Sequence, residues 1–319
     1  MSSATMRQEN FTLLSQKEIA ASVYEMKLAG DCSAITQPGQ FVNICVPGFF
    51  LHRPISVANV ERCGIDNAPA AGNGQADILT LIYKVVGQGT AALAAMQPGE
   101  IIELLVGLGN GYSLPESGAL PEPSAVCAAN SSSAAGASRE LGASRDARSL
   151  KDSYALHASD SSNRSDSRPL LLVGGGVGVP PLYWLAQKLR ERGHSVKVIL
   201  GFNSAVDVFY EQEFSELGCS VTVTTADGSY GLPGFVTAAM PDPSTYAYVY
   251  SCGPIPMLRA VAEASGDTPG ELSFEERMGC GFGACMGCSH TVLLPDGSRG
   301  YKRICVEGPV LRKEEILWK

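Results

Sequence analysis

The sequence lacks the features that would direct a protein to a membrane or to nucleic acid. The first residues show no basic segment followed by an apolar core, so we expect no secretory signal peptide. The longest mostly apolar run, residues 170–186, is interrupted by glycines and prolines and is shorter than the roughly 20 apolar residues that a membrane span needs. Basic residues are few: 24 Lys and Arg against 32 Asp and Glu leave a formal net charge of -8, which repels phosphate backbones and anionic lipids.

Histidine is also scarce, and no arrangement of residues indicates acid-base or nucleophilic catalysis. The chain has 4 histidines. His52 precedes an Arg-Pro-Ile-Ser segment, His157 falls in a stretch rich in Ser and Ala, and His194 lies in an expected turn. No grouping of Ser, His and Asp suggests hydrolysis, and no paired carboxylates stand out. We therefore assign no catalytic residue.

The 10 cysteines are present in two distributions. Six cysteines are scattered singly along a chain that is too long to need stabilisation by disulfides: Cys32, Cys45, Cys63, Cys127, Cys219 and Cys252. The other four follow the C-x4-C-x2-C…C spacing of a plant-type 2Fe-2S cluster, in which four thiolates hold two irons: Cys280, Cys285, Cys288 and Cys305. Without a signal peptide, clustered thiols indicate a metal site in a reducing, cytoplasmic compartment.

Two alternatives exist for this metal site. A structural zinc would take four thiolates, but its ligands usually come as two short-spaced pairs rather than as a triplet with one distant partner. His290 follows Cys288 by two residues and would be a Rieske-like ligand, but a fourth cysteine is available in Cys305. We expect His290 on the surface or beside the ligands.

Composition and hydrophobic periodicity divide the chain into four segments. Short strands separated by Gly- and Pro-containing turns predict a small antiparallel β-barrel over residues 1–114. Residues 115–168, where Ser and Ala supply nearly half of the positions, predict a disordered insertion. Alternating strand and helix patterns predict a parallel α/β sheet over residues 169–265, and a Gly- and Cys-rich C-terminal unit follows over residues 266–319.

Glycines at the start of the α/β segment indicate a dinucleotide site. The stretch LVGGGVGVPP at residues 172–181 joins an apolar strand to a helix, although it does not meet the strict G-x-G-x-x-G pattern. Backbone close to a helix N-terminus holds a pyrophosphate well. A second turn beyond a strand end, SCGP at 251–254, should lie at the same edge of the sheet. The candidate residues are Gly174, Gly175, Gly176, Gly178, Cys252, Gly253 and Pro254.

Two segments of the barrel indicate a second ligand, which combines phosphate with a flat heterocycle. In RPISV, Arg53 supplies a guanidinium that binds phosphate, and Ser56 can hydrogen-bond a ring edge. In IYKVVGQGT, residues 82–90 provide an aromatic side chain for stacking and a helix start. The candidate residues are Arg53, Pro54, Ile55, Ser56, Ile82, Tyr83, Lys84, Gly89 and Thr90.

The order of these motifs resembles the ferredoxin reductase superfamily. Within it, the segments RPISV, YKVVGQGT, LGNGY, SFEERMGCGFGACMGC and YKRICVEGPV look like those of type B dihydroorotate dehydrogenase electron transfer subunits. The similarity covers nearly the whole chain outside residues 115–168. It implies three domains: an antiparallel β-barrel that binds FAD, an α/β parallel-sheet domain that binds NAD, and a small C-terminal 2Fe-2S domain.

The resemblance also implies a function and a partner. Electrons would pass between NAD(H) and the FMN of a separate dihydroorotate dehydrogenase catalytic subunit through FAD and the 2Fe-2S cluster, in pyrimidine biosynthesis, within a heterotetramer of two copies of each subunit. After the second strand of the α/β segment no Lys or Arg stands where the 2'-phosphate of NADP would bind, so we expect NADH as the nucleotide.

Two other functions remain open from the sequence. The first is another flavin and iron-sulfur NAD(P)H reductase subunit, with a ferredoxin, sulfite or sulfide partner. The second is a nucleotide-binding regulatory protein stabilised by zinc, which would be colourless. A visible spectrum separates the second from the others, because flavin and iron-sulfur clusters absorb visible light.

Overall fold

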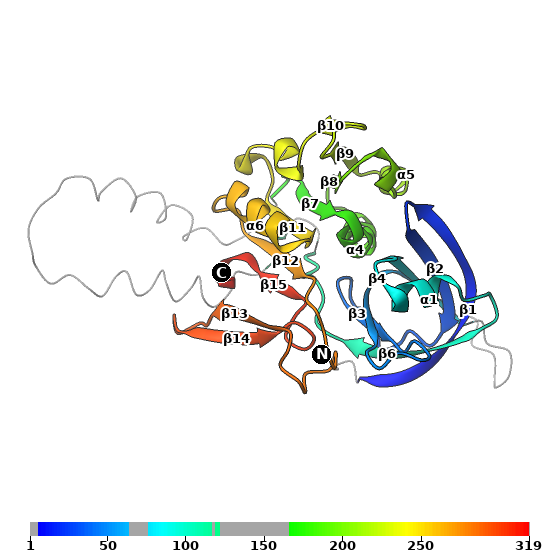
Figure 1. Cartoon of the computed structure of the whole chain (residues 1–319). Helices are drawn as coiled ribbons and strands as arrows, with labels where there is room; N and C mark the ends of the chain where they lie inside the picture. The colour runs from blue at the N-terminus through cyan, green and yellow to red at the C-terminus, as the bar shows by residue number, and fades with distance from the viewer. Residues whose placement is uncertain (1–5, 64–75, 117–118, 122–165, 319) are drawn as a thin grey trace, which may run out of the picture.

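The computed structural model describes residues 6–63, 76–116, 119–121 and 166–318 (Figure 1). The insertion expected at 115–168 lies mostly outside these described residues. No helix in the described part of the chain is long and apolar enough to cross a membrane.

The N-terminal part forms a closed antiparallel barrel of six strands in the order β1-β2-β5-β4-β3-β6. Buried and more exposed residues alternate along β6, and its buried residues are all apolar, so one face of the strand fills the barrel. This confirms the barrel expected from the sequence. The strands are β1 Arg7–Ala20, β2 Val23–Gly30, β3 Phe41–Ile44, β4 Arg53–Glu61, β5 Asp77–Lys84 and β6 Ile101–Leu108, and helix α1, Gln88–Ala94, follows β5.

The second part is a seven-stranded sheet in the order β10-β9-β8-β7-β11-β12-β15. All neighbours pair in parallel except β12 and β15, which are antiparallel. Its strands are β7 Leu170–Gly175, β8 Val196–Phe202, β9 Ser220–Thr225, β10 Leu232–Pro233, β11 Tyr248–Gly253, β12 Gly270–Phe274 and β15 Val310–Arg312. The helices between them are η2 Gly176–Gly178, α4 Val179–Glu191, η3 Ala205–Asp207, α5 Glu211–Glu216, η4 Val236–Ala239, η5 Pro243–Thr245 and α6 Ile255–Ala264.

Helices cover both faces of this sheet, as the sequence predicts. Strand β7 is buried along its whole length. Leu170 and Leu172 pack on one face with residues of α4 and α5. Leu171 and Val173 pack on the other face with Val236 of η4 and with α6. A strand buried on both faces reads as a continuous apolar run, which is why this segment is recognisable without alternation.

The C-terminal unit is less separate from the sheet than expected. Its own structure is the hairpin of β13, Ser289–Leu293, and β14, Arg299–Arg303, followed after β15 by η6, Lys313–Glu315. Strands β12 and β15 fall within the expected unit 266–319, but hydrogen bonds place them in the parallel sheet, with β12 beside β11 and β15 beside β12. The segment between β12 and β15 is therefore attached to the sheet at both ends.

The barrel and the sheet pack directly against each other. Helix α4 lies on β4, and Trp184 of α4 belongs to the barrel core. Tyr210 donates from its hydroxyl to the buried carboxylate of Glu25, with the oxygens 2.9 Å apart. Lys84 at the end of β5 reaches Asp207, with a nitrogen-oxygen distance of 3.2 Å. The strand ends of the sheet therefore face the barrel.

Candidate functional site

The four candidate cluster ligands occur as two pairs in the loop that follows β12 and in the segment after β14. Cys285 donates its backbone N–H to the sulfur of Cys280 at 3.4 Å. Cys288 and Cys305 are both buried, and the Ile304 N–H donates to the Cys288 carbonyl at 3.1 Å, which holds Cys305 beside Cys288. No three His, Cys, Asp or Glu side chains within the described ranges gather as ligands of one ion. Two thiol pairs fit two irons, each taking two cysteines.

The surroundings of the sulfurs differ between the pairs. Burial opposes ionisation of Cys280, but the N–H groups of Cys285 and Phe282 point at its sulfur and lower its pKa to about 6. Burial and the neighbouring Cys288 thiol raise the pKa of Cys305 to about 12. A cation held between such sulfurs stabilises all four as thiolates, so the donor set fits an iron-sulfur cluster.

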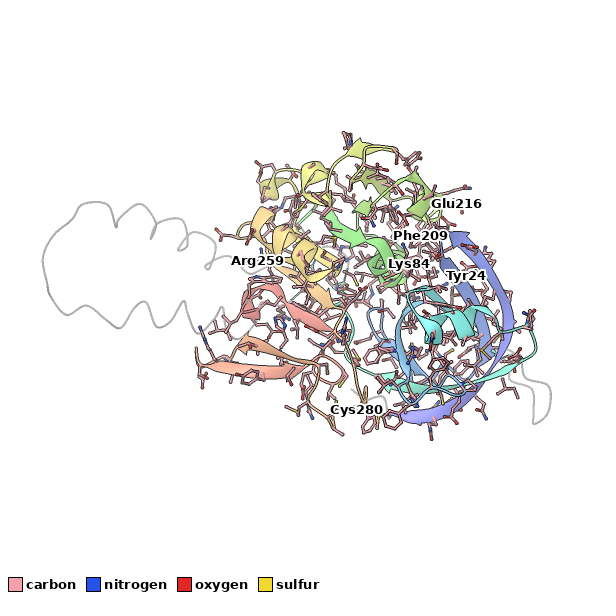
Figure 2. All side chains as sticks on the ribbon, in the orientation of Figure 1. Tyr24, Lys84, Phe209, Glu216, Arg259 and Cys280 are labelled. Atoms are coloured by element: carbon pink, nitrogen blue, oxygen red, sulfur yellow. The ribbon has the colours of Figure 1, made fainter. Side chains whose placement is uncertain are left out.

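The cluster loop rests on the barrel. Asn43 of β3 donates from Nδ2 to the carbonyl of Cys280 at 3.3 Å. Gly281 has φ +75, and a Cβ there would lie 2.3 Å from Asn43 Nδ2, so only glycine permits this approach. Cys280 lies at this junction between the C-terminal hairpin and the barrel (Figure 2). The Asn43 Oδ1 is buried with no hydrogen-bond partner among the described atoms, a polar atom left available where the two domains meet.

His290 is not on the surface. It lies on β13, 4% exposed, with its ring centroid 4.6 Å from that of Phe274 and its Nδ1 3.8 Å from a Glu276 oxygen. It occupies the core of the C-terminal unit, close to the strand that carries the cluster loop.

The candidate phosphate ligand of the barrel lies against the start of α1. A Cβ at Gly89 would lie 2.1 Å from a terminal nitrogen of Arg53, so the guanidinium fills the space that a larger residue would need. The Arg53 carbon Cζ also lies 5.2 Å from the centre of the Phe49 ring, and its Nη1 donates to the Leu51 carbonyl. Thr90 accepts hydrogen bonds from the Val86 and Gly87 N–H groups and so shapes the turn. The Arg53 guanidinium is a donor group of the kind that binds phosphate.

The remaining barrel candidates have different surroundings. Pro54, Ile55 and Ser56 lie half-buried on β4. Ile82 is buried in the core shared by barrel and sheet. The Tyr83 ring, expected to stack on a ligand, is instead 2% exposed inside the barrel, stacked on Tyr24 and bonded through its hydroxyl to Gln16. Its side chain therefore supports the barrel.

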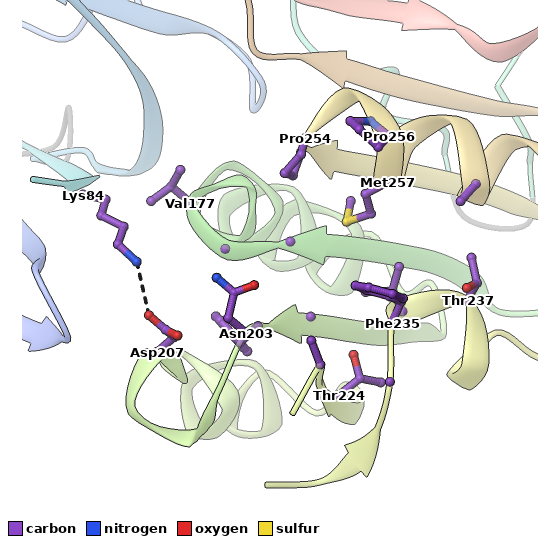
Figure 3. A pocket seen from close by; sticks show the side chains of 18 of the residues that line it. Lys84, Val177, Asn203, Asp207, Thr224, Phe235, Thr237, Pro254, Pro256 and Met257 are labelled. Carbon is purple, nitrogen blue, oxygen red and sulfur yellow. Dashed lines mark hydrogen bonds and ion pairs between the residues drawn. The ribbon is translucent and has the colours of Figure 1, made fainter. Parts of the chain in front are cut away.

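A cavity of about 540 Å³ opens at the carboxyl ends of the parallel strands, where ligands bind in open α/β sheets. Figure 3 shows Lys84 reaching towards Asp207 at its barrel side. Most residues that line the cavity come from the turns after β7, β8, β9, β11 and β12. They include Gly175, Gly176, Val177, Asn203, Ala226, Phe235, Pro254, Met257 and Glu275.

Some of the candidate dinucleotide residues line the cavity, and the others support the turns that form its wall. Gly175, Gly176 and Pro254 line the cavity. Gly174 packs under Val179 and Leu182. A Cβ at Gly178 would lie 2.3 Å from the Cys252 carbonyl oxygen, so this glycine lets α4 start against the end of β11. Cys252 is fully buried beside Tyr112 and Ser273, below the cavity rather than on its wall, and Gly253 has φ +154.

Sequence reasoning missed residues whose role depends on distant contacts. Asn43 meets a loop that is 237 positions away. Phe235 lines the cavity from a turn that carried no recognised motif, and Glu275 lines it from the start of the cluster motif, where only the cysteines had been given a role. A signal was present for two of them, because Asn43 interrupts an apolar strand and Glu275 directly follows one.

Comparisons with known proteins agree with this arrangement. Residues 275–317 match the iron-sulfur cluster binding domain of dihydroorotate dehydrogenase B, and residues 172–263 match an oxidoreductase NAD-binding domain. The first match removes zinc as the metal of the C-terminal unit.

The curated relatives extend the match to nearly the full chain. The chain is 36% identical to the dihydroorotate dehydrogenase B (NAD(+)) electron transfer subunit of Shouchella clausii, over 98% of each chain. It is 38% identical to the subunit of the same name from Geobacillus kaustophilus, over 97% of this chain and 98% of that one.

Solved structures show the same fold. The NADH-dependent reduced ferredoxin-NADP oxidoreductase structure superposes with a TM-score of 0.67 at 24% identity, over 97% of this chain and 90% of the other. The chain therefore shares the fold of that structure over nearly its whole length. Together with the full-length relatives, this shows that the chain belongs to the family of dihydroorotate dehydrogenase B (NAD(+)) electron transfer subunits.

Proposed function

We propose that this chain carries electrons between NAD(H) and the FMN of a dihydroorotate dehydrogenase catalytic subunit, during oxidation of dihydroorotate to orotate in pyrimidine biosynthesis. Support comes from the full-length likeness to subunits of that name and from three adjoining sites on one chain. Bound FAD supplies the conversion between the two-electron chemistry of nicotinamide and the one-electron chemistry of a 2Fe-2S cluster. The protein itself binds, orients and shields these groups.

One structural observation carries the proposal. Strand β12 ends at the nucleotide cavity, where Glu275 lines the wall, and the chain then runs straight into the loop that holds Cys280, Cys285 and Cys288. That loop touches β3 of the barrel through Asn43. The nucleotide cavity, the barrel and the thiol pairs therefore adjoin, as electron transfer between them requires.

We assign the residues as follows. Arg53, with Gly89 and the turn that Thr90 shapes, would hold the FAD phosphates. Pro54, Ile55, Ser56 and Lys84 would form the surrounding wall, and the buried Ile82 and Tyr83 would support it from the cores behind. Gly174, Gly175, Gly176 and Gly178 would place the NAD pyrophosphate, with Cys252, Gly253 and Pro254 at the facing turn. The four thiolates Cys280, Cys285, Cys288 and Cys305 would hold the cluster.

NADH is the nucleotide that the cavity favours. Among the described residues that line it, Lys84 is the only basic side chain, and Asp207 neutralises it. A 2'-phosphate would add negative charge there without an unpaired lining cation to meet it. This reducing nucleotide, the thiolate cluster and the biosynthetic role are consistent with the cytoplasm.

Purification of the chain with and without the catalytic subunit tests the proposal. The holo chain should show flavin and iron-sulfur absorption, be bleached by NADH, and associate with the catalytic subunit in a complex of two copies of each, measured by native mass spectrometry. Orotate-dependent oxidation of NADH should require both subunits. A coloured chain that reduces a ferredoxin but forms no complex with the catalytic subunit would instead support another reductase of the same fold.

A further inference from the structure

The nucleotide cavity has two ends along the sheet. Strands β8 and β9 lie on one side of β7, and β11 and β12 lie on the other. Asn203, Ala226 and Phe235 line the first end, and Pro254 and Glu275 line the second, with Gly176 between them at the start of α4. A dinucleotide with its pyrophosphate at this central turn places one base-bearing half at each end.

The second end suits the reacting ring. Gly253 pairs with Phe274, so Pro254 and Glu275 lie side by side where β11 and β12 stop. From Glu275 the chain continues directly to Cys280. If electrons pass from nicotinamide towards the cluster, as the proposed function requires, the nicotinamide occupies the end formed by Pro254 and Glu275.

Glu275 is the unusual group at this end. The other side chains there, including Pro254, Pro256, Met257 and Ala260, are apolar. Of the charged lining residues, Lys84 and Asp207 pair with each other, whereas Glu275 has no hydrogen-bond or ion-pair partner in the described part of the chain.

Glu275 is exposed and lines the cavity, so its carboxyl is open to an incoming ligand. Desolvation by the surrounding protein raises the pKa of this carboxyl. Its charge also adds to burial in raising the pKa of the Cys252 thiol beneath. A carboxylate on an otherwise apolar stretch of cavity wall is the acceptor that an amide donor of a ligand would meet there.

We propose that Glu275 recognises the carboxamide of the nicotinamide ring: it accepts a hydrogen bond from the amide NH₂ and repels dinucleotides that carry a carboxylate at that position. The inference rests on the proposed function for its assignment of the two ends. Glu275 is in this sense a specificity-determining residue that holds the ring.

Two substitutions and three ligands test it on the holo chain with calorimetry. Glu275→Leu removes the acceptor, and Glu275→Gln keeps an acceptor but removes the charge. The ligands are NAD⁺, ADP-ribose, which has no pyridine ring, and nicotinic acid adenine dinucleotide, whose pyridine carries a carboxylate. Glu276→Gln is the matched control, because Glu276 is the adjacent carboxylate and does not line the cavity.

For Glu275→Leu we expect the dissociation constant of NAD⁺ to rise about 10- to 100-fold with that of ADP-ribose unchanged. For Glu275→Gln we expect NAD⁺ binding within about tenfold of the original, and the preference for NAD⁺ over the carboxylate analogue to fall at least about tenfold. The control should match the original chain with all three ligands.

The inference is overturned if the Leu variant binds NAD⁺ normally, if it loses ADP-ribose equally, or if the Gln variant keeps the original discrimination. Failure of the proposed function gives a different result, because the unsubstituted chain would then not be reduced by NADH.

Discussion

At the scale of residues, the two thiol pairs are the proposed point of electron exit. Cys280 and Cys285 lie in the accessible part of the loop after β12. Cys288 of the same loop and Cys305, which follows β14, are buried. The spacing of these cysteines was recognisable from sequence because a cluster loop uses local chain geometry. The support from Asn43 was not, because it comes from a strand on another domain.

Replacement of Cys285 by Ser should remove the cluster while FAD stays bound, because Cys285 is a proposed iron ligand and lies outside the barrel. The visible spectrum should lose its iron-sulfur component, and electron transfer to the catalytic subunit should be abolished, while NADH still reduces the flavin. Cys63→Ser is the control: Cys63 is half-buried, and its sulfur donates a hydrogen bond to the Ala76 carbonyl at 3.2 Å. Full iron content in the Cys285→Ser variant would contradict the assignment.

Replacement of Arg53 by Ala should weaken FAD binding about 10- to 100-fold, because a charge-assisted phosphate contact is lost from the cradle beside Gly89. The Arg53→Lys variant should recover little of the FAD affinity, since lysine lacks the planar guanidinium that donates two parallel hydrogen bonds. Titration of the flavin-free chain with FAD, followed by fluorescence, measures the effect. Arg259→Ala, on the exposed face of α6, should leave the affinity unchanged, and an equal loss there would count against a specific site.

At the scale of elements, periodicity predicted most strands and helices but not the membership of the sheet. An apolar strand before the glycines of residues 172–181 and a helix after them were expected, and β7 and α4 lie there. Strands β12 and β15 were assigned to a separate C-terminal unit, because nothing local in these short segments reveals their partners. Residues 312–315 are all charged, yet Glu315 is 8% exposed and its carboxylate pairs with Lys302 at 2.6 Å.

The start of α4 provides a test at this scale. Gly178→Ala would push a methyl group into the Cys252 carbonyl, and φ at this glycine is -78, so the effect is steric. We expect a loss of about 1–3 kcal/mol in the free energy of unfolding and weaker NADH binding. Urea unfolding measures the first. Gly87→Ala, with nothing within 4 Å, should be neutral or stabilising by up to about 1 kcal/mol.

At the scale of the whole molecule, polar contacts set the position of the sheet relative to the barrel. The Tyr210 hydroxyl on Glu25 and the Lys84–Asp207 pair both cross this boundary. The Ala21 N–H also donates to the Val206 carbonyl at 3.0 Å. None of these contacts was foreseen, because each joins residues from different domains.

Replacement of Tyr210 by Phe should loosen this boundary, because it leaves a buried Glu25 oxygen without its donor. We expect a loss of about 1–3 kcal/mol and slower flavin reduction by NADH, with unchanged flavin and iron contents. Thermal unfolding and stopped-flow absorbance measure these effects. Tyr230→Phe is the matched control, since its hydroxyl meets Glu211 on the exposed surface, and it should change stability by less than about 0.5 kcal/mol.

The attachment of the cluster loop at both ends has a mechanical consequence. Strand β12 enters the loop and β15 leaves it, and the two strands pair with each other in one sheet. The nicotinamide end of the cavity and the thiol pairs therefore move as one body. If the barrel that carries the flavin shifts, the distance from the flavin to the nicotinamide and the distance from the flavin to the cluster change together. One hinge motion would therefore allow or prevent both electron-transfer steps.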